Sequence, residues 1–131
     1  MFPAESFFMS TKIKIKWLAK PEEHDYPAAG SYLNLFFDNE TVKGLVEKLR
    51  DAPVVSFKAK DIFRASGLSL LGVSNAHVLK DRKKIKAKVR LSPLLLVRES
   101  SNPRVIIADG YHRLCAVYTF SEDAMILCKI V

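Results

Sequence analysis

The residues with the clearest capacity for chemistry form a short run at the end of an apolar stretch. Asp109 and Gly110 follow residues 105–108, and an apolar helix is expected to begin directly after them. The first backbone N–H groups of a helix lack partners, and the helix dipole places partial positive charge there. Gly110 permits a sharp turn and the close approach of a ligand. This run therefore predicts an anion site, most suitably for phosphate, made of Asp109, Gly110, Tyr111, His112 and Arg113.

Asp109 admits three interpretations. It can cap the helix by accepting an N–H bond, which is the default for aspartate at this position. It can instead hold Arg113 or His112 in place, or bind a Mg²⁺ ion that accompanies a nucleoside triphosphate. His112 and Arg113 have a purely structural alternative as a buried pair that donates to neighbouring carbonyls. Two cationic groups at the start of an apolar helix are costly without an anionic partner, which favours an anion.

The elements around this turn predict a compact α+β domain. Residues 105–108 are apolar on both faces, so this strand is expected to be central in the sheet. Strict alternation at 12–17 indicates a strand with one wet face. The other expected elements are a short buried helix or turn at 31–37, a helix capped by Asp38 or Asn39 and ended by Pro53, a strand at 54–58, a helical turn at 61–65 stopped by Gly67, a helix capped by Ser74 or Asn75, a strand at 94–98, a helix from Gly110 to about Ser121 and a strand at 125–131.

The run from Gly110 to Ala116 fits the pattern G-x-[HR]-R-x-x-A and resembles the signature of the ParB/sulfiredoxin-like superfamily. The corresponding form is G-E-R-R-x-x-A in partition proteins and G-C-H-R in sulfiredoxins. The strand and short helix at 57–62 and the strand led by Pro93 also match, so the resemblance covers residues 54–131. Residues 1–53 are expected to be an N-terminal strand-helix extension packed on that core.

This resemblance implies a mixed-sheet fold with a nucleotide-phosphate pocket. In the superfamily a second helix N-terminus faces the arginine helix across the site, which implies that Ser74, Asn75 and His77 lie near His112 and Arg113. A cap at Ser74 or Asn75 would leave free amides there as well. The ligand expected from the resemblance is a nucleotide or another phosphate compound, with Mg²⁺ if a triphosphate binds.

Two departures limit what the resemblance implies about activity. Tyr111 stands where sulfiredoxins have their catalytic cysteine, and Cys115 lies one helical turn further on, so sulfinic-acid chemistry lacks its nucleophile. Partition proteins continue into DNA-reading and dimerisation domains, whereas this chain ends at Val131. It also lacks an E-N-x-Q-R type motif. Neither chromosome partition nor CTP-gated clamp closure is therefore expected.

The net charge of +7 is concentrated in one segment, because residues 80–90 hold seven basic residues and one acid. Only Ile85 and Val78 are expected to point inward from this helix. The segment can bind DNA or RNA phosphates in a salt-dependent way, or it can be a solvated helix face. It contains no interleaved aromatic residues, so no stacking platform for bases is expected. The candidate nucleic-acid contacts are Lys80, Arg82, Lys83, Lys84, Lys86 and Lys88.

The 131 residues are enough for one domain with a real core. No apolar run approaches the roughly 20 residues that cross a bilayer, and the first residues do not form a signal peptide. Cys115 and Cys128 fit no zinc spacing and are expected to be reduced core thiols. These features predict a cytoplasmic protein without membrane contact, and they leave the oligomeric state open.

Three functions follow from these patterns. The first is nucleotide or phosphate binding, extended to phosphoryl transfer or nucleotide hydrolysis if Asp109 holds Mg²⁺. No second acid in the matched motifs identifies itself as a general base, so binding is better supported than catalysis. The second is a ParB-like DNA-binding or nuclease accessory protein, with binding favoured because a nuclease needs clustered carboxylates. The third is a partner-binding module that exposes Trp17, Phe36 and Phe37.

Overall fold

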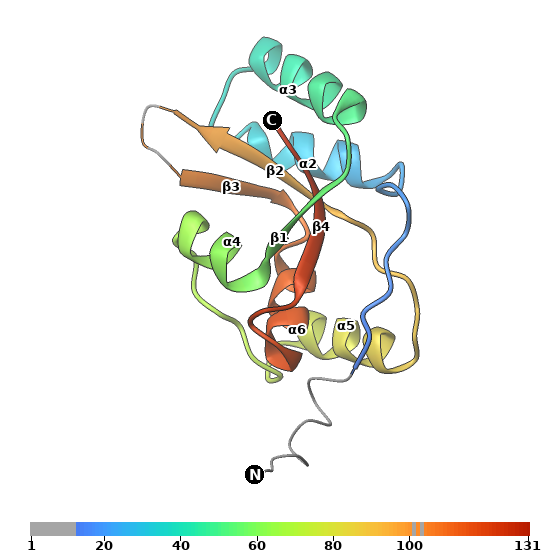
Figure 1. Ribbon diagram of the computed structural model, residues 1–131. Helices are drawn as coiled ribbons and strands as arrows, with labels where there is room; N and C mark the ends of the chain where they lie inside the picture. Colours follow the sequence, from blue (N-terminus) through green and yellow to red (C-terminus); the bar gives the residue numbers. More distant parts are fainter. Residues whose placement is uncertain (1–12, 101, 103) are drawn as a thin grey trace.

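A four-stranded mixed sheet organises the chain, and helices cover both of its faces (Figure 1). The computed structural model describes residues 13–100, 102 and 104–131. The strand order is β1-β4-β2-β3, in which β2 and β4 are parallel and the other two pairs are antiparallel. The elements are α2 (Asp25–Leu33), α3 (Asn39–Asp51), β1 (Val55–Lys58), α4 (Ala59–Ser66), α5 (Ala76–Lys86), β2 (Leu94–Glu99), β3 (Arg104–Asp109), α6 (Tyr111–Phe120) and β4 (Met125–Ile130).

Strand β2 lies inside the sheet because its first four residues are apolar on both faces and fully buried. Leu94 and Leu96 join a core cluster with residues of α4, α5 and α6. Leu95 and Val97 join a second cluster with residues of α2 and α3. The alternation of side chains along one strand thus connects the two layers of helices through the sheet.

The prediction that β3 is a central strand is wrong, because β3 lies at the edge of the sheet. Its apolar residues are nevertheless buried, with Ile106 and Ile107 at most 5% exposed. Helix α2 packs on one face of β3 and α4 packs on the other. Two covering helices therefore produce the same apolar pattern that a central position would produce.

The helices before Pro53 share a core with the sheet. Helix α2 buries Tyr26, Ala29 and Leu33, and it begins earlier than the expected segment at 31–37. Helix α3 begins as predicted, because the Asp38 side chain accepts a hydrogen bond from the Thr41 amide at 2.8 Å. Both helices contribute to the cluster around β2 and β3, so they complete the hydrophobic core on that face.

The strand predicted at 12–17 is wrong for the described residues, and Lys12 lies outside them. Trp17 makes only an isolated bridge to Leu91, supported by backbone bonds from Leu18 and Leu91 of 2.8 Å each. Trp17 is half-buried against the core, Phe36 is 43% exposed and Phe37 is half-buried. Of the three aromatic residues expected to be exposed, only Phe36 is largely so.

The α+β class and the mixed sheet are confirmed, and the remaining elements lie close to their predicted positions. Cys115 and Cys128 are buried and unpaired, and burial raises the pKa of Cys128 to about 11. Over the part of the chain that the structure describes, no helix has both the length and the apolar character needed to span a membrane.

Lys129 provides a test of how α3 is tied to the sheet. Its side chain is 7% exposed, and its Nζ donates to the Arg50 carbonyl in the last turn of α3 at 2.7 Å. That carbonyl has no partner within the helix, so the bond satisfies a helix end. Lys129→Ala should lower the free energy of unfolding by about 2 kcal/mol, measured by urea denaturation. The exposed Lys43→Ala in the same helix should change it by less than ~0.5 kcal/mol.

Candidate functional site

A polar pocket with a volume of about 220 Å³ lies between α5 and the start of α6. Helix α5 supplies two lysines, a histidine and an aspartate, and the turn into α6 supplies the rest of the lining. The pocket joins the turn at the start of α6 to the basic helix, as the resemblance implied for His77. Its lining residues are His77, Lys80, Asp81, Lys84, Asp109, Gly110, Tyr111, His112 and Arg113.

Gly110 is the N-cap of α6 and has a φ of 107°, in the left-handed region. A Cβ atom at this position would lie 2.6 Å from Leu94 Cγ, so only glycine fits both the conformation and the space. No side chain caps α6, and its first turn holds no acid. The amides of Tyr111, His112 and Arg113 have no acceptor among the described residues. These three amides can therefore donate hydrogen bonds to an anion.

The Asp109 carboxylate accepts no capping hydrogen bond from α6, so the prediction that it caps this helix is wrong. Its Oδ2 lies 2.9 Å from Arg113 Nη2, one helical turn further on. This contact agrees with the alternative in which Asp109 holds Arg113 in place. Burial raises the pKa of Asp109 although Arg113 opposes the rise. A Mg²⁺ ion would therefore compete with Arg113, and to some extent with a proton, for this carboxylate.

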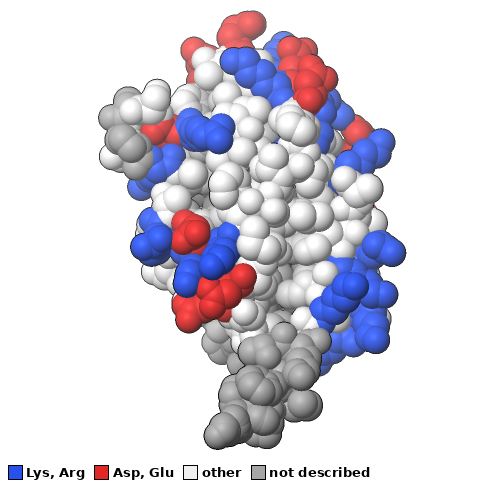
Figure 2. Space-filling view, in the orientation of Figure 1, with Lys and Arg blue, Asp and Glu red and all other residues white. Residues whose placement is uncertain are grey.

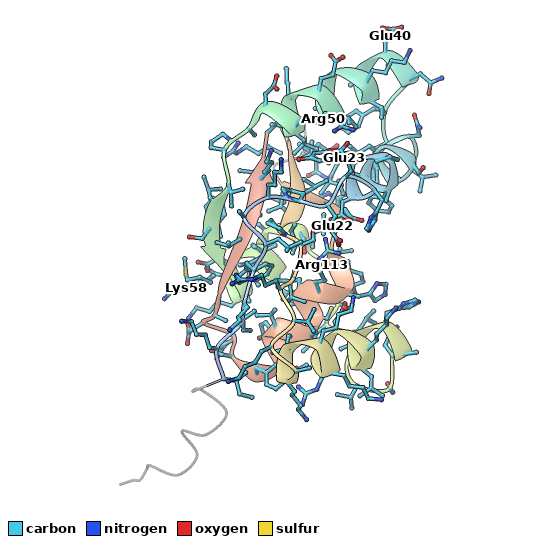
Figure 3. All side chains as sticks on the ribbon, turned by 90° about the vertical axis from the view of Figure 1, so that its right-hand side faces the viewer. Glu22, Glu23, Glu40, Arg50, Lys58 and Arg113 are labelled. Carbon is cyan, nitrogen blue, oxygen red and sulfur yellow. The ribbon has the colours of Figure 1, made fainter. Side chains whose placement is uncertain are left out.

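Arg113 is held between two carboxylates from distant parts of the chain. Its Nη2 also lies 3.6 Å from Oδ2 of Asp25, and the Ser92 hydroxyl donates to that same oxygen. The Asp25 side chain is 5% exposed, and those of Arg113 and Asp109 are 19% exposed. Figure 3 labels Arg113 below Glu22, which precedes α2. This arrangement leaves Arg113 little freedom to grip a phosphate with both of its nitrogens.

Asp25 is the site residue that the sequence reasoning missed. It lies in the first turn of α2, in a segment that carries no motif, and only the packing of α2 brings it to Arg113. His24 Nε2 lies 3.3 Å from Asp25 Oδ1. Ligand atoms of Glu22, His24 and Asp25 all fall within 4.8 Å of one another. Asp25 already accepts a hydrogen bond from Ser92 and forms an ion pair with Arg113. We therefore interpret this cluster as part of the set of residues that holds Arg113 in place.

His77 and His112 stack obliquely at the mouth of the pocket. Their ring centroids are 4.8 Å apart with an interplanar angle of 38°. Burial lowers the pKa of His112 below its ordinary value of 6.5, and charge on His77 lowers it further, while Asp81 opposes the shift. The neutral form of His112 is therefore favoured more than in a free histidine. An anion between the two rings would favour its protonated form.

The N-terminus of α5 does not face the pocket in the expected way. The Asn75 side chain accepts hydrogen bonds from the amides of His77 and Val78 at 2.9 and 3.2 Å, so it satisfies the start of its own helix. Ser74 and Asn75 lie outside the pocket lining, and His77 lies within it. The structure thus brings together His77, the α6 turn and two lysines, and it leaves Ser74 and Asn75 apart.

The basic helix divides into three groups of residues. Val78 and Ile85 are buried as predicted, and Asp81 is buried beside them. Arg82 is committed to α6, because it donates to Thr119 Oγ1 and its guanidinium carbon lies 4.2 Å from the Phe120 ring centroid. The lysines are exposed, and none pairs with a carboxylate of the described residues: Lys80, Lys83, Lys84, Lys86 and Lys88.

Figure 2 shows Lys and Arg side chains gathered over α5 and the segment that follows it, without acidic side chains between them on this face. Lys80 and Lys84 also line the pocket. The cationic face is therefore continuous with the anion turn.

Comparison of the chain with protein-family models, curated proteins and solved structures found no significant match. The relationship to the ParB/sulfiredoxin-like superfamily therefore remains a prediction from the residue pattern.

The role of Asp25 can be tested by its removal. Asp25→Asn should lower the free energy of unfolding by about 3 kcal/mol, because a buried arginine loses one of its two charged partners. Chemical denaturation measures this change. Asp51→Asn, an exposed aspartate at the end of α3, is the matched control and should have an effect below ~0.5 kcal/mol. Equal effects of the two substitutions would contradict a supporting role for Asp25.

Proposed function

We propose that this protein binds a phosphate-bearing anion, the phosphate end of a nucleotide, in the pocket at the start of α6. The observation that carries the proposal is the set of three amides at the N-terminus of α6 that have no acceptor among the described residues. They adjoin a pocket lined by Lys80, Lys84 and two histidines. Helix amides donate to phosphate oxygens, and nearby cations strengthen those bonds.

The charge balance around the pocket supports an anionic ligand. The negative charge of Asp109 is countered by Arg113, and Asp81, the other acid in the lining, is only 9% exposed. Lys80 and Lys84 have no acidic partner among the described residues. The lining is largely polar, and its small volume suits phosphate groups better than an apolar base. A nucleoside attached to the bound phosphate would then extend over the surface outside the pocket.

Arg113 acts in this proposal as a positioning residue. It donates a hydrogen bond to Asp109, which directly precedes Gly110, and forms an ion pair with Asp25, so it holds the turn that presents the amides. Phosphoryl transfer would need a carboxylate that can hold Mg²⁺ or accept a proton at the phosphate. Asp109 is occupied by Arg113, and therefore we propose binding without turnover. The pattern G-x-[HR]-R-x-x-A, through its resemblance to the ParB/sulfiredoxin-like superfamily, supports the same ligand class.

A second candidate is contact with the backbone of a nucleic acid along α5. It is favoured by the exposed lysines Lys83, Lys86 and Lys88, which continue the cationic surface beyond the pocket. Such binding would be electrostatic and would weaken steeply with salt. It would use the side chains of α5 more than the amides of α6.

Calorimetric titration with pyrophosphate, ATP and CTP, with and without Mg²⁺, tests the first candidate. We expect saturable binding that weakens about tenfold in His112→Ala and in Lys80→Ala, because each removes a donor from the pocket. Lys43→Ala removes an exposed lysine of α3 and should leave the affinity unchanged. Release of inorganic phosphate during the titration would contradict the absence of turnover.

His112→Ala and a further variant, Lys83→Ala, separate the two candidates in a titration with a DNA duplex. Binding that falls steeply with salt, weakens in Lys83→Ala and is indifferent to His112→Ala would favour the nucleic-acid surface. Failure of every phosphate probe to bind would refute the proposal that the pocket binds phosphate. Arg113→Ala is a poor diagnostic, since it also removes the partner of two carboxylates.

Affinity should also depend on the protonation of His112. In the unliganded protein its pKa lies below 6.5, and a bound anion should raise it. Affinity should therefore be greatest below the pKa of the unliganded protein and fall as the pH rises through the pKa of the complex. Sulfate keeps a constant charge over this range, so its titration isolates the histidine. A pH-independent sulfate affinity, or an unchanged profile in His112→Ala, would contradict this role.

A further inference from the structure

A second cavity, with a volume of about 260 Å³, lies between α4 and the sheet. Its floor reaches the hydrophobic core, because Ile62 and Leu96 are at most 3% exposed. Phe57, Ala65 and Val105 form apolar walls, and Ile130 closes the side at β4. This cavity shares no lining residue with the phosphate pocket. It is therefore a separate feature, independent of the proposed function.

Arg98 also lines the cavity. Leu94, Leu96 and Arg98 alternate along β2, so Arg98 lies on the same face of the sheet as the buried leucines. The positive charge of Arg98 opposes the rise in the pKa of Cys128, a residue of that same face. Its backbone amide donates to a backbone oxygen of Val131 at 2.7 Å. The guanidinium of Arg98 forms no ion pair or hydrogen bond with the described residues, and Arg98 is exposed.

The one acidic side chain in the lining, Asp61, is paired elsewhere. Its Oδ1 lies 2.9 Å from Arg64 Nη2 on the outer side of α4. The negative charge at the cavity is thus partly countered, while the charge of Arg98 is not. An apolar chamber with one uncompensated guanidinium is complementary to a ligand with an apolar body and a single anionic end.

We infer that this cavity binds a small apolar monocarboxylate, with its hydrocarbon part against Ile62, Leu96 and Val105 and its carboxylate on Arg98. The guanidinium can accept a carboxylate with two parallel hydrogen bonds, and the apolar walls remove the rest of the ligand from water. The volume lies just below the usual range for drug-sized ligands, which restricts the occupant to a short chain or a single ring.

The probes that test this inference are 3-phenylpropionate and its neutral amide, which have the same shape. In titrations of the full chain followed by NMR, 3-phenylpropionate should shift the methyl signals of Ile62, Leu96, Val105 and Ile130. The amide should bind about tenfold more weakly, because it lacks the charge that Arg98 recognises. Arg98→Gln should weaken binding of the acid about tenfold and leave binding of the amide unchanged.

Two variants and one control complete the test. Ala65→Leu and Val105→Met each fill part of the cavity and should abolish binding of both probes, with folding checked by circular dichroism. Lys48→Gln removes one exposed positive charge on the opposite face of the sheet and should have no effect. Equal affinity for acid and amide, an unchanged affinity in Arg98→Gln, or absence of shifts at the four methyl-bearing residues would each overturn the inference.

Discussion

The charge on Arg113 is the constraint on which the geometry of the site depends. Its guanidinium is largely removed from solvent, so it must be paired to avoid a large desolvation cost. Asp109 pairs with it from the end of β3, and Asp25 pairs with it from the start of α2. Ser92, just before β2, bonds to Asp25. One cation thereby joins segments that are far apart along the chain.

These interactions of Arg113, Asp109 and Asp25 determine the shape of the pocket but do not occupy it. Because Asp109 is occupied by Arg113, it leaves the amides at the start of α6 without a cap. Gly110 completes the turn because a side chain there would collide with Leu94. The lysines beside these amides come from a different element, α5, which Arg82 fastens to α6 through Thr119. The pocket therefore depends on the packing of α5 against α6 as well as on the ion pairs of Arg113.

The two faces of the sheet carry different sets of helices. Helices α2 and α3 cover one face, whereas α4, α5 and α6 share the other (Figure 1). Beside α4 this second cover is incomplete, and β2 passes there from buried leucines to the exposed Arg98. The two cavities therefore differ in their lining: the pocket at the start of α6 is polar and carries two lysines of the cationic face, whereas the cavity beside α4 is mostly apolar.

Local physics determined much of this protein from sequence alone. The caps at Asp38 and Asn75, the glycine turn at Gly110 and the inward positions Val78 and Ile85 each depend on residues within a turn or two of helix. Backbone hydrogen bonding and helical periodicity are sufficient to predict such features. The turn at the start of α6 belongs to the same class, because its amides without acceptors among the described residues follow from the strand, the glycine and the helix.

Only the tertiary structure decided which distant segments meet. The apolar pattern of β3 did not reveal an edge strand, because covering helices bury it as well as neighbouring strands would. Nothing near Asp25 in sequence indicated Arg113 as its partner. Arg82 turned out to bind α6, whereas Lys80 and Lys84 reach the pocket. Charge and periodicity specify which face of an element is polar, but the packing of the elements specifies what that face meets.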